Sequence, residues 1–161
     1  MQQLAATLLA REVNSELVAT LQEPATAAIL KQLEPSCIEL LGREWTKKDF
    51  NDAAVEFCRL FILEPKVPAR AAAYFEEKEL EIASRIQFML DNGLLEIPEG
   101  FQTLSPDHIA ILLLVQTTLA GEDAIQFKKD SLSWLPEFAR KLADQSKHPF
   151  YQLVAKLISL S

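Results

Sequence analysis

The fold is decided by residues 104–121, which read LSPDHIAILLLVQTTLAG. From Ile109 to Ala120 this stretch is apolar almost all round, and a helix of that kind belongs at the centre of a bundle. Ser105 suits the N-cap of such a helix and Pro106 suits its first position. Asp107 and His108 would then occupy the first turn, where unpaired N–H groups favour a carboxylate and a neutral imidazole.

Helical periodicity continues along the rest of the chain. The predicted apolar stripes recur at spacings of three and four residues, which is typical of amphipathic helices. No alternating pattern of convincing length predicts a strand, so the sequence predicts one all-α domain over residues 1–161, a bundle of roughly seven helices. The stripes are Leu4–Leu21, Ile29–Leu33, Phe50–Phe61, Phe75–Leu90, residues 109–120, a helix from about Asp123, and Phe150–Ile158.

Capping and breaking residues set the expected ends of these helices. Thr46 and Asp49 are alternative N-caps for the helix over residues 50–61, and Gly93 is a natural residue to follow the helix that ends near Leu90. Gly121 is expected to end the central helix, and Pro136 to kink or break the helix that follows. Pro149 is expected to start the last helix, and residues 94–104 to form a loop.

The chain is acidic, because 23 Asp and Glu residues outnumber 16 Lys and Arg residues and give a net charge of −7. An acidic chain without a basic cluster is a poor candidate for binding nucleic acid or an anionic membrane, and a fair one for binding a basic peptide. The longest uncharged stretch is too short to span a bilayer. The N-terminus lacks the basic region of a secretory signal, so we expect a cytoplasmic protein without stable membrane insertion.

The sequence offers few features that would support catalysis. The four glycines are isolated and form no phosphate-binding loop. His108 and His148 are far apart in sequence, and Cys37 and Cys58 fit no zinc or redox spacing, so we expect no metal and no cofactor. Asp107 and His108 remain possible partners in acid–base chemistry, but nothing marks a nucleophile beside them.

Four short motifs nevertheless occur together in one order. The sequence reads Glu56-Phe57-Cys58-Arg59-Leu60-Phe61, then Pro106-Asp107-His108-Ile109, then Trp134-Leu135-Pro136-Glu137-Phe138, and finally Pro149-Phe150-Tyr151. In these motifs and their spacing, from about Asp49 to the C-terminus, the chain resembles the TorD/DmsD/NarJ family of cytoplasmic chaperones for complex redox enzymes.

The resemblance implies an all-helical, TorD-like fold and no catalysis. Members of the family bind the twin-arginine signal peptide of a molybdenum-containing oxidoreductase and hold the enzyme back from export until its cofactor is inserted. The partner implied here is such a signal peptide or the apo form of the enzyme. The sequence is compatible with a monomer or, through the loop over residues 94–104, with a helix-swapped dimer. The family's peptide-binding residues carry over to Leu60, Phe61, Pro68, Asp107 and His108.

The chain differs from the family pattern at four places. A Pro-Pro-Trp type of sequence is replaced by Pro68-Ala69-Arg70, a Gly-Pro-Gly before it by Leu63-Glu64-Pro65, a Glu by Leu112 and a His by Asp130. We expect the binding site to combine an apolar cleft beside Leu60 and Phe61 with the fixed negative charge of Asp107. Two other interpretations remain open at this point. The chain could be a helical adaptor for a mature redox-enzyme subunit, or a nucleotide hydrolase that uses Asp107 and His108.

Overall fold

The computed structural model describes residues 2–75 and 79–160 of the chain, and these residues form ten α-helices and no strand. The prediction of an all-α fold is therefore confirmed, although the helices are more numerous than the seven expected from the sequence. None of the helices searched within that part of the chain combines the length and apolar character needed to cross a membrane.

Two compact units divide the chain, and each is assembled from segments that are separate in sequence. Unit 1 contains residues 1–11 and 69–136, and unit 2 contains residues 12–68 and 137–161. The expectation of a single domain over residues 1–161 stays a prediction.

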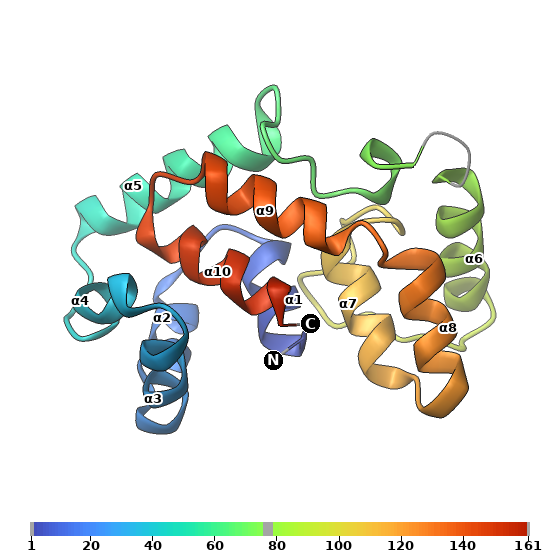
Figure 1. Ribbon diagram of the computed structural model, residues 1–161, viewed down its shortest axis with the longest axis horizontal. Helices are drawn as coiled ribbons and strands as arrows, with labels where there is room; N and C mark the ends of the chain where they lie inside the picture. The colour runs from blue at the N-terminus through green and yellow to red at the C-terminus, as the bar shows by residue number, and fades with distance from the viewer. Residues whose placement is uncertain (1, 76–78, 161) are drawn as a thin grey trace. The chain divides into compact units, whose positions relative to one another are not determined.

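Unit 1 is built around the apolar helix that the sequence singled out. This helix is α7 (Ile109–Thr118), and it packs against α1 (Gln2–Ala10) and α8 (Gly121–Ser131) (Figure 1). Both sides of the α1–α7 contact include alanines, which let the helices approach closely. The buried contributors from α1 and α7 are Ala5, Ala6, Leu8, Leu9, Ile109, Ala110, Ile111, Leu112, Leu113 and Val115.

The remaining helix of unit 1 is α6 (Glu79–Asp91), which contacts the short 3₁₀ helix η3 (Ala71–Ala73). Its C-terminus follows the predicted pattern. Gly93 has a φ of +66°, and the amides of Gly93 and Leu94 donate to the carbonyls of Leu90 and Met89. This is a Schellman motif, in which glycine is favoured because the position requires left-handed backbone.

Unit 2 contains α2 (Ser15–Gln22), α3 (Pro24–Leu33), α4 (Ile38–Leu41), α5 (Lys47–Phe57) and α10 (Pro149–Ser159). A 3₁₀ helix, η1 (Pro35–Cys37), joins α3 to α4, and the π-helix η2 (Cys58–Ile62) continues α5. The remaining helix, α9 (Leu135–Gln145), begins with two residues assigned to unit 1 and continues into unit 2. The start of α10 at Pro149 confirms the prediction made from the sequence.

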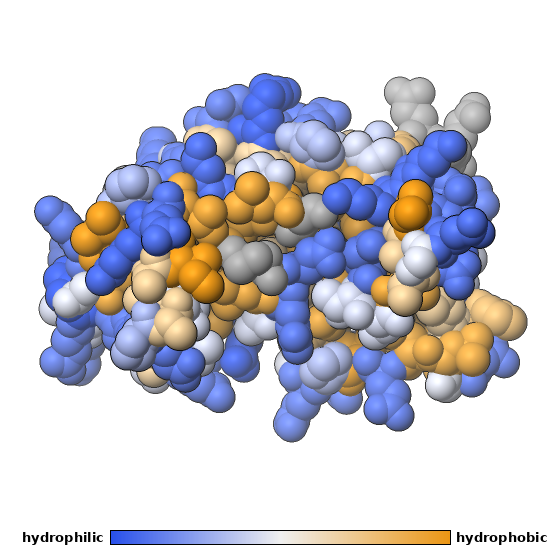
Figure 2. Space-filling model, turned by 60° about the horizontal axis from the view of Figure 1, so that its bottom comes forward, coloured by the Kyte–Doolittle hydropathy of each residue, from blue (hydrophilic) through white to orange (hydrophobic). Residues whose placement is uncertain are grey.

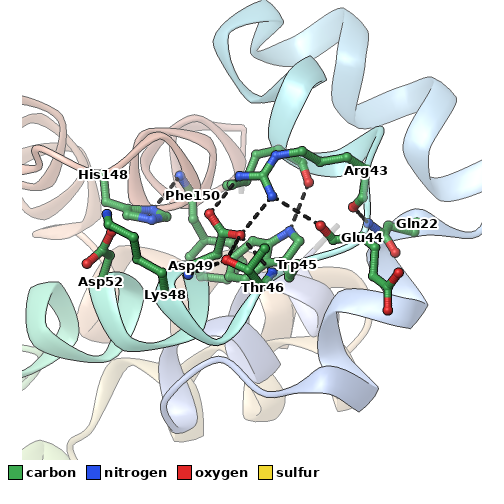
Figure 3. Close-up of polar contacts among 11 residues, drawn as sticks. Gln22, Arg43, Glu44, Trp45, Thr46, Lys48, Asp49, Asp52, His148 and Phe150 are labelled. Carbon is green, nitrogen blue, oxygen red and sulfur yellow. Dashed lines mark hydrogen bonds and ion pairs between the residues drawn. The ribbon is translucent and has the colours of Figure 1, made fainter.

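A capping box starts α5 and confirms Thr46 as its N-cap. The Thr46 hydroxyl accepts from the Asp49 amide, and the Asp49 carboxylate accepts from the Thr46 amide at 2.7 Å. Figure 3 shows Arg43 donating to the same carboxylate through two nitrogens, at 2.7 and 2.6 Å. The indole of Trp45 lies beside this cap and donates to the Leu40 carbonyl at 2.8 Å. Together these contacts fix where the helix leading to Leu60 begins.

Three helix boundaries differ from the expectations. The stripe over residues 4–21 is interrupted after Ala10, because the Asn14 side chain accepts from the Leu17 amide and starts a new helix. Helix α7 ends at Thr118, and Gly121, with a φ of +58°, is the first residue of α8. The break expected at Pro136 is confirmed, but it lies slightly earlier than expected: α8 ends at Ser131 and α9 begins at Leu135, with Pro136 in its first turn, where it removes no helical hydrogen bond.

The surface carries apolar side chains at scattered positions among charged ones. On the face shown in Figure 2, separate hydrophobic areas lie between hydrophilic residues. The large apolar residues that are exposed are Ile29, Ile38, Val55, Ile62, Leu63, Phe88, Leu94, Ile125 and Leu160.

Candidate peptide-binding site

The five predicted site residues fall into two sets. Asp107 and His108 belong to unit 1, whereas Leu60, Phe61 and Pro68 belong to unit 2.

Asp107 precedes α7 and does not lie in its first turn, so that prediction was wrong. Residues 105–108 form a turn in which the His108 amide donates to the Ser105 carbonyl at 2.9 Å, with Pro106 at the position that proline favours. The segment then pairs with residues 69–71, because the Ile109 amide donates to Ala69 and the Ala71 amide donates to Asp107. This long-range backbone pairing holds residues 105–108 out of the helix.

The carboxylate of Asp107 is buried and bonded on both oxygens. Its Oδ1 accepts from Nε of Arg70 at 3.0 Å and its Oδ2 accepts from the Ala72 amide at 3.2 Å. The Asp107 side chain is 1% exposed, whereas that of Arg70 is 56% exposed. Solvent therefore meets the guanidinium of Arg70 at this point, and the negative charge of Asp107 lies beneath it.

The bonding partners of Asp107 keep it ionised. Burial opposes the charged form, but hydrogen bonds from Ser105, Arg70 and the Ala72 amide outweigh it and hold the pKa of Asp107 below its ordinary value. Asp107 thus offers a permanent negative charge whose present partner is the exposed Arg70.

His108 is the N-cap of α7, the role that the sequence assigned to Ser105. Its Nδ1 accepts from the Ala110 amide at 3.2 Å, so the neutral ring carries its hydrogen on Nε2. Burial lowers the pKa of His108 from 6.5 to about 4, Asp107 opposes this shift, and Arg70 adds to it. The expectation of a neutral imidazole at this helix end agrees with the geometry, although the residue lies one step before the helix.

We expect the capping role of His108 to make unfolding pH-dependent. Between pH 6.5 and about 4 the unfolded chain binds a proton at His108 that the folded protein does not bind. The contribution of His108 is therefore fully present above pH 6.5 and is lost as the pH falls towards 4, a decrease of about 3 kcal/mol in the free energy of unfolding.

Urea unfolding at pH 7 and pH 4.5 measures this dependence. His108→Asn keeps a good capping residue that does not titrate in this range, so its pH dependence should be flatter than that of the unmodified protein. Burial also lowers the pKa of His148, so His148 contributes to the pH dependence too. Because both proteins contain His148, its contribution cancels when their pH dependences are compared. Equal pH dependence in the two proteins would contradict the assignment.

In unit 2, Leu60 and Phe61 lie on the π-helix η2 and differ in exposure. Leu60 is completely buried. Phe61 is partly exposed and belongs to an aromatic cluster, since its ring centroid lies 5.2 Å from that of Phe57, 5.9 Å from that of Tyr151 and 6.5 Å from that of Phe138. Leu60 therefore supports this surface from the core, and Phe61 is the side chain that can contact a ligand directly.

The end of η2 extends the apolar surface. Ile62 is 58% exposed and Leu63 is 70% exposed, and both follow Phe61 directly. The chain then turns back, because the Val67 amide donates to the Leu60 carbonyl at 3.0 Å. Pro68, at the end of this loop, is half-buried. Phe61, Ile62 and Leu63 thus place three consecutive apolar side chains at least partly in contact with solvent.

Comparison with known proteins assigns the family. The family model described as the nitrate reductase delta subunit matches residues 14–152, which include all five predicted site residues. The chain belongs to this family. The resemblance to the TorD/DmsD/NarJ chaperones seen in the sequence is thereby confirmed.

One curated relative of this delta-subunit family member is the "Chaperone protein TorD" of Aggregatibacter aphrophilus (strain NJ8700). The two sequences are 29% identical over 117 residues, which cover 66% of this chain and 55% of the relative. The match thus spans about half the length of that relative. No solved structure matches this chain.

Two residues with structural roles in this delta-subunit family member, Glu56 and Arg70, were not predicted from the sequence as functional. Glu56 is buried and accepts from Arg59 at 2.7 and 2.9 Å and from the Lys147 amide at 2.6 Å, which ties the end of α5 to the loop before α10. Arg70 was identified from the sequence only as a residue that differs from the family pattern. Its pairing with Asp107 spans 37 residues, and no local signal predicts such a contact.

Catalysis or metal binding gains no support from the described residues. In residues 2–75 and 79–160 no three His, Cys, Asp or Glu side chains are grouped so that they could hold a metal ion. Asp107 and Nδ1 of His108 are already bonded to Arg70 and to backbone amides. These bonds hold the turn before α7 against residues 70–72 and cap α7.

Proposed function

We propose that this protein is a maturation chaperone for a redox enzyme and binds the enzyme's leader peptide. The client is a molybdenum-containing oxidoreductase with a twin-arginine leader, and binding in the cytoplasm delays export until the cofactor is inserted. Membership of the nitrate reductase delta subunit family over residues 14–152 is the observation that carries the proposal. The relative named as a chaperone supports it.

The apolar part of the leader binds to the surface formed by Phe61, Ile62 and Leu63. Ile62 and Leu63 are mostly exposed in the free protein, so their burial against a ligand is favourable at roughly 25 cal/mol per Å² of apolar area. Leu60 and Pro68 shape this surface, Leu60 from the core and Pro68 from the adjoining loop. Such burial offsets the association cost of several kcal/mol and allows micromolar affinity.

The leader's arginine pairs with Asp107, and His108 holds the turn that presents it. The carboxylate is bonded to Arg70 in the free protein, so an incoming guanidinium must replace that of Arg70. The Arg70 side chain can leave Asp107 for solvent, because it is 56% exposed and is bonded to the carboxylate through Nε. The affinity for an arginine-containing peptide therefore depends on competition between the peptide's arginine and Arg70 for the Asp107 carboxylate.

Calorimetry on the full chain tests the proposal. A synthetic twin-arginine leader from a molybdenum-containing oxidoreductase encoded in the same genome is expected to bind with a Kd on the order of micromolar. A matched peptide with both arginines replaced by glutamine should bind at least about tenfold more weakly, which corresponds to the loss of about 1.4 kcal/mol. Absence of binding to every such leader would overturn the proposal. Capture of a leaderless client alone would favour the adaptor interpretation.

Arg70→Met is expected to strengthen binding of the twin-arginine leader by about tenfold. The substitution removes the competing guanidinium, and one hydrogen bond to a charged group is worth roughly 1.5 kcal/mol. The gain should be absent with the glutamine-substituted peptide, which supplies no replacement charge. Calorimetry with both peptides measures the difference. An unchanged or reduced affinity of Arg70→Met for the twin-arginine leader would rule out the competition.

A further inference from the structure

A groove runs along one face of α6 in unit 1. It has a volume of about 450 Å³ and is lined by Ala83, Ser84, Gln87, Phe88, Asp91 and Pro106. The first five occur at the spacing of a single helical face, and Pro106 comes from the turn before Asp107. The other face of α6 is anchored in the core by Ile82 and Ile86, which are almost fully buried. We call these six lining residues the α6 groove.

The α6 groove is apolar in part and acidic at one end. Ala83, Phe88 and Pro106 supply carbon surface, and the Phe88 side chain is 61% exposed. Asp91 lies at the C-terminal end of α6, where it accepts from Nε2 of Gln87 at 2.8 Å. The groove is shallow and open to solvent, so it suits contact with a segment of polypeptide and not the enclosure of a small molecule.

The charge of the surrounding chain selects the kind of ligand. From Ile86 to Phe127 the sequence contains no Lys or Arg, and the exposed acids Asp91, Glu96 and Glu99 follow the groove along the chain. Within the groove itself the charged side chain is Asp91, and a carboxylate attracts a cationic group and repels an anionic one. A second copy of this chain, with a net charge of −7, is therefore a poor occupant.

We propose that the α6 groove binds a peptide segment in which an apolar side chain and a basic residue lie close together. The apolar side chain packs against Phe88 and Pro106, and the basic side chain pairs with Asp91. This inference rests on the proposed function, because the segment is part of the client's leader. It adds a second contact region in unit 1, continuous along the chain with Asp107 through Pro106.

Three substitutions in the full chain test the groove by calorimetry with the twin-arginine leader. Phe88→Ser removes the exposed ring and Ala83→Trp fills the groove, and each should weaken binding at least tenfold. Ile125→Ser is the matched control, because Ile125 is also an exposed apolar residue of unit 1, at 71%, but it does not line the groove. The control should bind within twofold of the unmodified protein, and circular dichroism should show equal helix content in all four proteins.

Asp91→Lys tests the charge. This variant should bind the leader at least tenfold more weakly than the unmodified protein. In a series of leader peptides, each with a different single basic residue replaced by glutamate, one peptide should regain affinity for the variant. Equal losses for all these peptides would overturn the pairing with Asp91. If the unmodified protein binds the leader but Phe88→Ser and Ala83→Trp bind it equally well, the groove is not a contact region. If the unmodified protein binds no leader, the proposed function fails and this inference fails with it.

Discussion

Replacing Glu56 with alanine is expected to lower the free energy of unfolding by about 3 kcal/mol, the low end of the range for breaking a buried ion pair. Glu56 is 7% exposed and accepts from Arg59 and from the Lys147 amide. The substitution leaves the guanidinium and the amide without this acceptor. Hydrogen bonds from both groups, acting against burial, hold the pKa of Glu56 below its ordinary value, so the charge is present at neutral pH.

Urea unfolding of the variant at pH 7 measures this loss. Asp144→Ala is a suitable control, because Asp144 pairs with Arg140 four residues away on the surface of α9. An exposed pair of this kind is worth about 0.5 kcal/mol, so the control should unfold almost like the unmodified protein. Similar losses in Glu56→Ala and Asp144→Ala would show that the buried carboxylate does not anchor the loop before α10.

Asp107→Ala is expected to destabilise the protein by about 3 kcal/mol and to abolish the preference for arginine in the leader. The carboxylate joins the turn before α7 to residues 70–72, and its loss leaves the partly buried amide of Ala72 without this acceptor. Leaving a buried donor unsatisfied costs about 1–3 kcal/mol by itself. Urea unfolding and calorimetry with the arginine and glutamine peptides measure the two effects separately.

Asp107→Asn distinguishes the structural role of Asp107 from its role in binding. The amide oxygen can still accept from Ala72, so about half of the stability loss should be recovered. The negative charge is absent, so the arginine preference should remain lost. A variant that keeps the arginine preference would exclude Asp107 as the partner of the leader's guanidinium.

Local signals in the sequence predicted much of the fold. Thr46 and Asp49 form the cap of α5, and Gly93 ends α6 in left-handed backbone. These predictions succeed because the hydrogen bonds involved span only a few residues. The apolar run of α7 likewise predicts its own burial, since a helix without a polar face has to be covered on all sides.

Features that depend on distant partners could not be predicted in this way. The pattern Ser105-Pro106 is compatible with a helix start, and it was overridden by pairing between residues 69–71 and 107–109. The exposure of neighbouring side chains could not be predicted either. Leu60 and Phe61 are adjacent on η2, but only Phe61 reaches the surface. The α6 groove also requires Pro106 to approach a helix that ends fifteen residues earlier.

The interleaving of the two units has a consequence for synthesis on the ribosome. Helix α1 is made about a hundred residues before its partner α7, so the apolar side of α1 is not covered until α7 has been synthesised. Unit 1 can close once residue 136 has emerged, whereas unit 2 needs residues 137–161 as well. Because neither unit is contiguous, no single cut yields both as separate fragments. A nascent chain stalled before residue 109 should therefore be a good substrate for general folding helpers.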